Sequence, residues 1–250
     1  ETTSVWLASI LQFCIDGELL ASFKVFKLNM KEIKYTIYQK LLTVMSSIMM
    51  GCESTKDINE VLGSETLAAN MLDMDRFPDQ SQINTFLTRM DLDSISQLKD
   101  IHHELFIKYS HSLSTPEDIV VDIDQSGLGA NSKTYEFADK GYFPRKRGKK
   151  GYQVSAAFAG KHSETVDFYF DPGNTHCQDR LKELLNSIIL KFKDALKAGK
   201  LIIRADSGYG AFDNITMLNG IEGLKFIVKG YSTKKAASIA KAVSFSDYTQ

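Results

Sequence analysis

The sequence has few cysteines, no long apolar run and no basic leader. Its three cysteines, Cys14, Cys52 and Cys177, lie far apart, which argues against a disulfide framework or a cysteine metal site. The longest apolar run, residues 41–51, contains two serines and is too short to cross a bilayer. The chain begins at Glu1 without a basic stretch, so no signal peptide is expected. We therefore expect a cytoplasmic protein with reduced cysteines and no membrane partner.

The chain also lacks an excess of either charge. Its 30 basic and 31 acidic residues give a net charge of −1, so no overall basic field indicates a nucleic-acid partner. The hydrophobic share of 43% and the charged share of 24% are ordinary for globular proteins. A chain of 250 residues is long enough for two domains and a sizeable core.

Two β-branched runs each end on an aspartate. Residues 119–124 read Ile-Val-Val-Asp-Ile-Asp, and residues 201–206 read Leu-Ile-Ile-Arg-Ala-Asp. A strand positions its last side chain better than a loop does, and two carboxylates that converge at adjacent strand ends suit Mg²⁺ or Mn²⁺. The alternative is that each aspartate only caps a turn after a buried strand. The occurrence of two such runs favours the metal site.

The first run contains two candidate acids. Asp122 and Asp124 alternate onto the same face of the strand. We favour Asp124 as the ligand because it sits at the expected strand end, where the sheet opens to solvent. Asp122 is expected to be a supporting or structural acid.

The apolar patterns around these aspartates predict a mixed sheet. We expect strands at residues 119–124, 152–159, 166–171, 201–206 and 224–229, and helices at 179–196 and about 212–219. Three strands in hairpin-like succession, then helix, strand, helix and strand, is the order of a ribonuclease-H-like fold. A helical crossover places the fourth strand parallel to the first. Asp124 and Asp206 would then be neighbours.

The front of the chain is nearly free of strand patterns. Helical periodicity covers residues 31–50 and 95–109, and Phe77-Pro78 opens a further helix. The segment from Thr115 to Glu117 marks a boundary. The fold class is therefore mixed α/β, with an all-α domain at residues 1–117 and a sheet domain with flanking helices at 118–250.

A basic segment joins the first two strands of the sheet domain. Between Gln125 and Lys150 there are seven basic residues and two acidic ones, with aromatic residues interleaved. The basic residues are Lys133, Lys140, Arg145, Lys146, Arg147, Lys149 and Lys150. Such a segment can hold a DNA backbone by charge and an unpaired base by stacking, although an isolated basic run is also typical of a solvated loop. Its place next to Asp124 favours DNA contact by Arg145, Lys146, Arg147, Lys149 and Lys150.

Four blocks, at residues 122–126, 150–152, 171–175 and 204–208, resemble the motif blocks of bacterial DDE transposases from cut-and-paste insertion sequences. The resemblance runs from about residue 30 to the end of the chain. It implies a ribonuclease-H-like catalytic domain, two Mg²⁺ or Mn²⁺ ions, and DNA strand cleavage and transfer at terminal inverted repeats. By position, Asp124 and Asp206 match the first two acids of the catalytic triad.

The sequence departs from this family at the third acid, which the family carries as a glutamate on a downstream helix. After Asp206 the only acids are Asp213, Glu222 and Asp247, and none lies in a late helix with a basic partner. The position of the third acid is left open. We expect the chain to be a fragment, or a protein shortened by mutation, that ends inside the catalytic domain or its insertion.

The resemblance also implies partners and a location. We expect double-stranded DNA, as transposon ends and target, a homodimer on DNA, DNA binding by the helical domain, and a nucleoid-associated position in the cytoplasm. One alternative is a non-catalytic DNA-binding remnant of such an enzyme. Another is a related metal-dependent nuclease that cuts without strand transfer.

Overall fold

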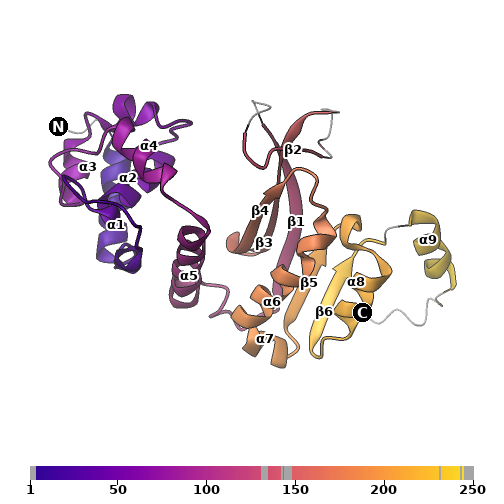
Figure 1. Ribbon diagram of the computed structural model, residues 1–250. Helices are drawn as coiled ribbons and strands as arrows, with labels where there is room; N and C mark the ends of the chain where they lie inside the picture. The colour runs from indigo at the N-terminus through magenta and orange to yellow at the C-terminus, as the bar shows by residue number, and fades with distance from the viewer. Residues whose placement is uncertain are drawn as a thin grey trace. The chain divides into compact units, whose positions relative to one another are not determined.

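The computed structural model describes residues 4–130, 135–141, 143, 148–230, 232–242 and 244. The chain divides into two compact units, residues 1–109 and 110–250 (Figure 1). The division falls before residue 117 because the segment after Tyr109 already bonds to the second unit. Ser110 Oγ and the backbone N–H groups of His111 and Ser112 all donate to the Glu164 carboxylate, at 2.7, 2.7 and 3.1 Å.

The described part of the first unit is helical and contains no strand. Its elements are α1 (Val5–Asp16), the 3₁₀ helix η1 (Ala21–Val25), α2 (Ile37–Met49), the π-helical turn η2 (Ile58–Leu62), α3 (Thr66–Met71), α4 (Gln80–Thr88) and α5 (Leu92–Tyr109). Helix α2 begins after the expected residue 31 because Thr36 and Gln39 form a capping box. The Gln39 N–H donates to Thr36 Oγ1 at 3.1 Å, and the Thr36 N–H donates to Gln39 Oε1 at 3.0 Å.

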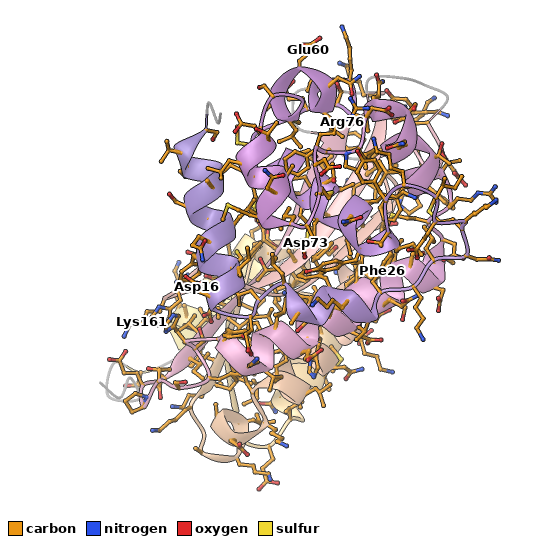
Figure 2. All side chains as sticks on the ribbon, turned by 90° about the vertical axis from the view of Figure 1, so that its left-hand side faces the viewer. Asp16, Phe26, Glu60, Asp73, Arg76 and Lys161 are labelled. Carbon is orange, nitrogen blue, oxygen red and sulfur yellow. The ribbon has the colours of Figure 1, made fainter. Side chains whose placement is uncertain are left out.

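Two apolar clusters form the core of the helical unit. The larger contains Leu7, Leu11, Leu42, Leu62 and Ile83, among other residues. The smaller contains Phe26, Leu41, Phe86 and Ile101, with an edge-to-face contact between the rings of Phe26 and Phe86. Figure 2 shows Phe26 among the helices and Glu60 at the outer surface of this unit. The helical unit therefore has a hydrophobic core of its own.

The second unit is built on a mixed sheet. Its strands are β1 (Ile119–Gly129), β2 (Asp139–Lys140), β3 (Lys150–Ala159), β4 (Glu164–Pro172), β5 (Leu201–Ala205) and β6 (Leu224–Val228). Its helical elements are η3 (Cys177–Arg180), α6 (Leu181–Lys191), α7 (Lys193–Lys197), η4 (Ser207–Tyr209), α8 (Phe212–Asn219) and α9 (Thr233–Ala242). The helix expected at residues 179–196 is thus divided into η3, α6 and α7.

The strand order confirms the predicted ribonuclease-H-like sheet. β4 and β2 both pair with β3, which is followed across the sheet by β1, β5 and β6. β1 runs antiparallel to β3 and parallel to β5, while β5 and β6 are parallel to each other. α6 packs against β3 and β4, and α8 packs against β6 (Figure 1).

Alternating residues of β1 and β5 form the core of the sheet unit. Ile119, Val121 and Ile123 are buried, as are Leu201 and Ile203 on the neighbouring strand. Helix α6 adds its own buried stripe, which consists of Leu181, Leu184, Leu185 and Ile188. The residues between the buried ones on β1, including Asp122 and Asp124, therefore face the opposite side of the sheet.

The expectation that the first strand ends at Asp124 is wrong. β1 continues to Gly129 along β3, and its last register pair is Gly129 with Gly151. What ends near Asp124 is the pairing with β5, whose last pair is Ile123 with Ala205. The sheet therefore opens on one side of β1 only. No described helix is long and apolar enough to cross a membrane.

Candidate active site

Asp124 and Asp206 occupy equivalent positions on two adjacent parallel strands. Each directly follows a residue of the last β1–β5 register pair, Ile123 and Ala205. Both aspartates are exposed, and both line one cleft of about 1020 Å³. The cleft opens where β5 stops while β1 continues along β3. The structure thus brings together the two acids that the sequence analysis expected to be neighbours.

Each of these carboxylates uses one oxygen to order its own turn. Oδ1 of Asp124 accepts from the Gln125 N–H at 2.8 Å, and Oδ1 of Asp206 accepts from the Gly208 N–H at 2.8 Å. Asp206 therefore does cap the turn η4, as the alternative reading supposed. The Oδ2 atom of each aspartate has no hydrogen-bond partner within the described ranges, and these two oxygens are free for a ligand.

Asp122 is already paired with a cation. It lies opposite Arg204 in the β1–β5 register, and Arg204 Nε and Nη2 donate to its two carboxylate oxygens at 2.5 and 2.7 Å. The hydrogen bonds to Asp122 raise the pKa of Arg204. Asp122 thus has a structural partner, Arg204, and lies two residues before Asp124 on β1. Asp124 is therefore the acid of β1 that lines the cleft.

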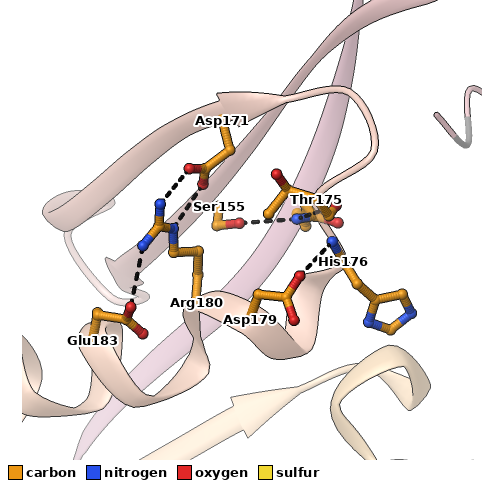
Figure 3. A network of polar contacts seen from close by, with 8 residues as sticks. Ser155, Asp171, Thr175, His176, Asp179, Arg180 and Glu183 are labelled. Carbon is orange, nitrogen blue, oxygen red and sulfur yellow. Dashed lines mark hydrogen bonds and ion pairs between the residues drawn. The ribbon is translucent and has the colours of Figure 1, made fainter. Parts of the chain in front are cut away.

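The turn after β4 forms one rim of the cleft. Asp171 is buried, and Arg180 Nη2 and Nε donate to its oxygens at 2.5 and 2.9 Å. Arg180 also donates to Glu183 at 3.1 Å (Figure 3). The hydrogen bonds to Asp171 are the main reason that the pKa of Arg180 is raised. Asp171 is therefore a structural acid that joins the end of β4 to the start of α6.

Side-chain amides and His176 order the rest of this rim. Gln125 Nε2 donates to Ser155 Oγ at 3.0 Å and to the Thr175 carbonyl at 3.5 Å. The Gln178 N–H donates to His176 Nδ1. The His176 N–H donates to Asp179 Oδ2 at 3.0 Å (Figure 3). His176 therefore caps η3.

Part of the basic segment reaches the cleft. Arg145, Lys146 and Arg147 lie outside the described residues. Lys149 is exposed and Lys150 begins β3, where it stands directly opposite Lys140 in the antiparallel register. Lys140 lines the cleft together with Asp124 and Asp206. The sequence analysis counted Lys140 among the basic residues but did not single it out, because a two-residue strand has no periodicity to detect.

Glycines allow the basic segment to approach the rim closely. A Cβ atom on Gly141 would lie 1.6 Å from the Gly173 carbonyl oxygen, and one on Gly173 would lie 2.2 Å from the Asp139 carbonyl oxygen. Phe143 is buried, and a Cβ on Gly151 would meet its ring at 2.7 Å. These close contacts hold the described part of the segment, and hence Lys140, beside the cleft.

The site as described offers two carboxylates. No group of three or more His, Cys, Asp and Glu side chains in the described part of the chain is arranged to hold a metal ion. Asp213 lies in the first turn of α8, and Glu222 lies between α8 and β6. Neither lines the cleft, and Asp247 is outside the described residues. Two further cleft residues that the sequence analysis did not select are Cys177 and Tyr209.

The chain was compared with known proteins. The family model described as "Transposase DDE domain group 1" matches residues 18–249. The comparison with curated proteins finds no match. Among solved structures, the chain resembles a piggyBac transposase in a synaptic complex with hairpin DNA, with 14% identity, 92% of this chain and 50% of that chain covered, and a TM-score of 0.46.

Two further solved structures show similar levels of likeness. The Drosophila P element transposase in a strand transfer complex has 13% identity, coverage of 92% and 50%, and a TM-score of 0.41. The Mos1 mariner paired end complex with Mn has 13% identity, coverage of 94% and 83%, and a TM-score of 0.32. The chain thus spans about half the length of the piggyBac and P element proteins that it matches.

Proposed function

This chain belongs to the DDE transposase family, group 1, and on that premise we propose that it is the catalytic core of a transposase. Its activity would be divalent-metal-dependent cleavage and transfer of DNA strands at the terminal inverted repeats of an insertion sequence. The observation that carries this proposal is the placement of Asp124 and Asp206 after one register pair of two parallel strands, on one cleft.

The two aspartates are the proposed catalytic acids and metal ligands. Family members use divalent metal ions, and here both aspartates line the cleft. Each has an Oδ2 atom that no described residue bonds, and a carboxylate oxygen is a hard ligand that suits Mg²⁺ or Mn²⁺. Two bound ions would supply the activation of the nucleophile and the stabilisation of the leaving oxygen. The protein's part is to hold the carboxylates, and the backbone bonds to Oδ1 fix each of them in orientation.

The basic segment is the proposed DNA contact. Lys140 and Lys150 stand directly opposite each other on β2 and β3, and Lys140 lines the cleft. Two basic residues at this position can contact the phosphates of a DNA backbone that enters the cleft. The proposed DNA-binding residues are Lys140, Arg145, Lys146, Arg147, Lys149 and Lys150.

The remaining expectations belong to the same proposal. The helical unit at residues 1–109 would contribute to DNA binding, and two copies would bind a pair of transposon ends. A cytoplasmic, nucleoid-associated location would follow from the DNA substrate.

The test is a cleavage reaction on supercoiled DNA that carries the ends of the parent element, with Mg²⁺ or Mn²⁺. We expect cleavage that exposes a 3′ hydroxyl, followed by joined products. Asp124→Asn and Asp206→Asn should abolish both and still bind DNA. Cleavage without joined products would instead indicate a metal-dependent nuclease. DNA binding without any cleavage would indicate a non-catalytic remnant.

A further inference from the structure

Tyr209 belongs to the cleft wall, and its hydroxyl group makes no hydrogen bond to any described residue. The residue is 1% exposed and lines the same cleft as Asp124 and Asp206. Its hydroxyl oxygen is buried and has no hydrogen-bond partner among the described residues. A buried polar group without a partner is unfavourable, so such groups in folded proteins usually have a role.

Hydrogen bonds hold the main chain of the turn that carries Tyr209. The Tyr209 N–H donates to the Asp206 carbonyl at 3.3 Å, and Asn214 Nδ2 donates to the Tyr209 carbonyl at 3.0 Å. The turn itself is tightly packed, since a Cβ on Gly208 would lie 2.9 Å from Cys177 Sγ and 3.0 Å from Asp206 Oδ1. The main chain from which the ring extends is therefore held in place, and the ring itself is buried.

The charge environment keeps this hydroxyl a donor. Burial raises the pKa of Tyr209, and the neighbouring Cys177, Asp124 and Asp206 raise it further. A tyrosine hydroxyl is an ordinary hydrogen-bond donor near neutral pH, and in this neutral form it is a poor direct ligand for a cation. Both proposed metal ligands lie close enough to act on its hydroxyl electrostatically.

We propose that Tyr209 is a positioning residue, whose hydroxyl donates a hydrogen bond to an oxygen atom coordinated by the cation that Asp124 and Asp206 hold. This inference rests on the proposed function, because it requires a divalent cation in the cleft. It assigns the otherwise unpaired hydroxyl a partner that arrives only with the cation. It also explains why a phenol, rather than a phenyl ring, lines the cleft that contains the two carboxylates.

The test is Tyr209→Phe in the full chain, because this change removes only the hydroxyl oxygen. We expect the thermal stability of the metal-free variant to equal or exceed that of the wild type, since an unpaired buried group is lost. Its affinity for Mn²⁺, measured by calorimetry, should fall about 10- to 100-fold, the usual effect of losing a group that supports a metal site.

Tyr152→Phe is the matched control. The Tyr152 hydroxyl donates to the Glu136 carbonyl at 2.8 Å and does not line the cleft. This variant should therefore show the opposite pattern, with lower thermal stability and an unchanged affinity for Mn²⁺. The two variants together separate loss of a donor that supports the metal site from loss of a structural hydrogen bond.

Three results would overturn the inference, and they are distinguishable. Equal Mn²⁺ affinity in the wild type and Tyr209→Phe would remove the role of Tyr209 and leave the two-aspartate site standing. Loss of both stability and affinity in Tyr209→Phe would show that the hydroxyl already stabilises the metal-free protein, and its role would then be structural. Absence of Mn²⁺ binding in a folded wild-type chain would overturn the proposed metal site and this inference with it.

Discussion

Arg204 on β5 donates to both carboxylate oxygens of Asp122 on β1, at 2.5 and 2.7 Å. Asp122 lies two residues before Asp124, and Arg204 lies two residues before Asp206. Residues two apart on a strand share one face of the sheet. The guanidinium compensates the charge of Asp122, so the uncompensated negative charge on this face belongs to the two acids at the cleft. Asp122 thus stabilises the strand pair without competing for a cation.

This relationship predicts a different behaviour for the two acids of β1. Asp122→Asn should still bind Mn²⁺, because Asp122 pairs with Arg204 and does not line the cleft. Asp124→Asn should lose the binding. Calorimetric titration of both variants checks this expectation, and complete loss of binding in Asp122→Asn would make Asp122 a ligand.

The ion pair between Arg180 and Asp171 predicts a stability effect. Arg180→Met would leave the Asp171 carboxylate, 5% exposed, without its cation. We expect the free energy of unfolding to fall by about 2 kcal/mol, less than for a fully buried pair because Arg180 is partly exposed. Urea denaturation measures this change. The double variant Asp171→Asn/Arg180→Met should recover part of the loss, and wild-type stability in the single variant would contradict the account.

Glu164 predicts a dependence of stability on pH. Burial acts to raise the pKa of Glu164, but hydrogen bonds from Ser112, Ser110 and the backbone outweigh it, so the pKa lies below the ordinary 4.5. The stabilisation is therefore fully present above about pH 4.5 and is lost as the pH falls through the lowered pKa. Glu164→Gln should reduce stability at neutral pH by about 1 kcal/mol.

Thermal unfolding measured across the acid range checks this prediction. The difference between wild type and Glu164→Gln should shrink as the pH falls below the lowered pKa. Glu222→Gln, at an exposed turn position, is the control and should follow the wild type throughout. A difference that stays constant down to the lowest pH would show that the carboxylate charge of Glu164 has no part in the effect.

Lys140 predicts a change in the salt dependence of DNA binding. If Lys140 contacts one phosphate, Lys140→Ala should weaken binding to duplex DNA of any sequence. The slope of log affinity against log salt concentration should become shallower by about 0.9. Lys193→Ala, which changes an exposed lysine of α7 outside the cleft, should leave the slope unchanged. Equal slopes for the wild type and Lys140→Ala would exclude the contact.

Much of the sheet unit could be predicted from side-chain patterns. The β-branched runs indicate β1 and β5, and the stripe through Leu181 and Ile188 indicates α6. The extension of β1 to Gly129 could not be predicted in this way, because residues 125–129 read Gln-Ser-Gly-Leu-Gly and contain no β-branched residue. Pairing with β3, not local preference, makes that segment a strand.

Some residues of the candidate site could likewise be predicted from the sequence, and others could not. Asp124 and Asp206 could be selected because each follows a recognisable strand, and strand order makes them neighbours. Lys140 could not be selected, because its place depends on the close contact of Gly141 with Gly173, residues far apart in the sequence. Tyr209 follows a common turn sequence, and only the burial of its hydroxyl distinguishes it.

The central claim is that Asp124 and Asp206 form one divalent-metal site. Calorimetric titration of Mn²⁺ into the wild type, Asp124→Asn and Asp206→Asn, each shown by thermal unfolding to be folded, tests it most directly. We predict binding in the wild type and its loss in both variants. Wild-type affinity in either variant, or no binding by the folded wild type, would contradict the claim.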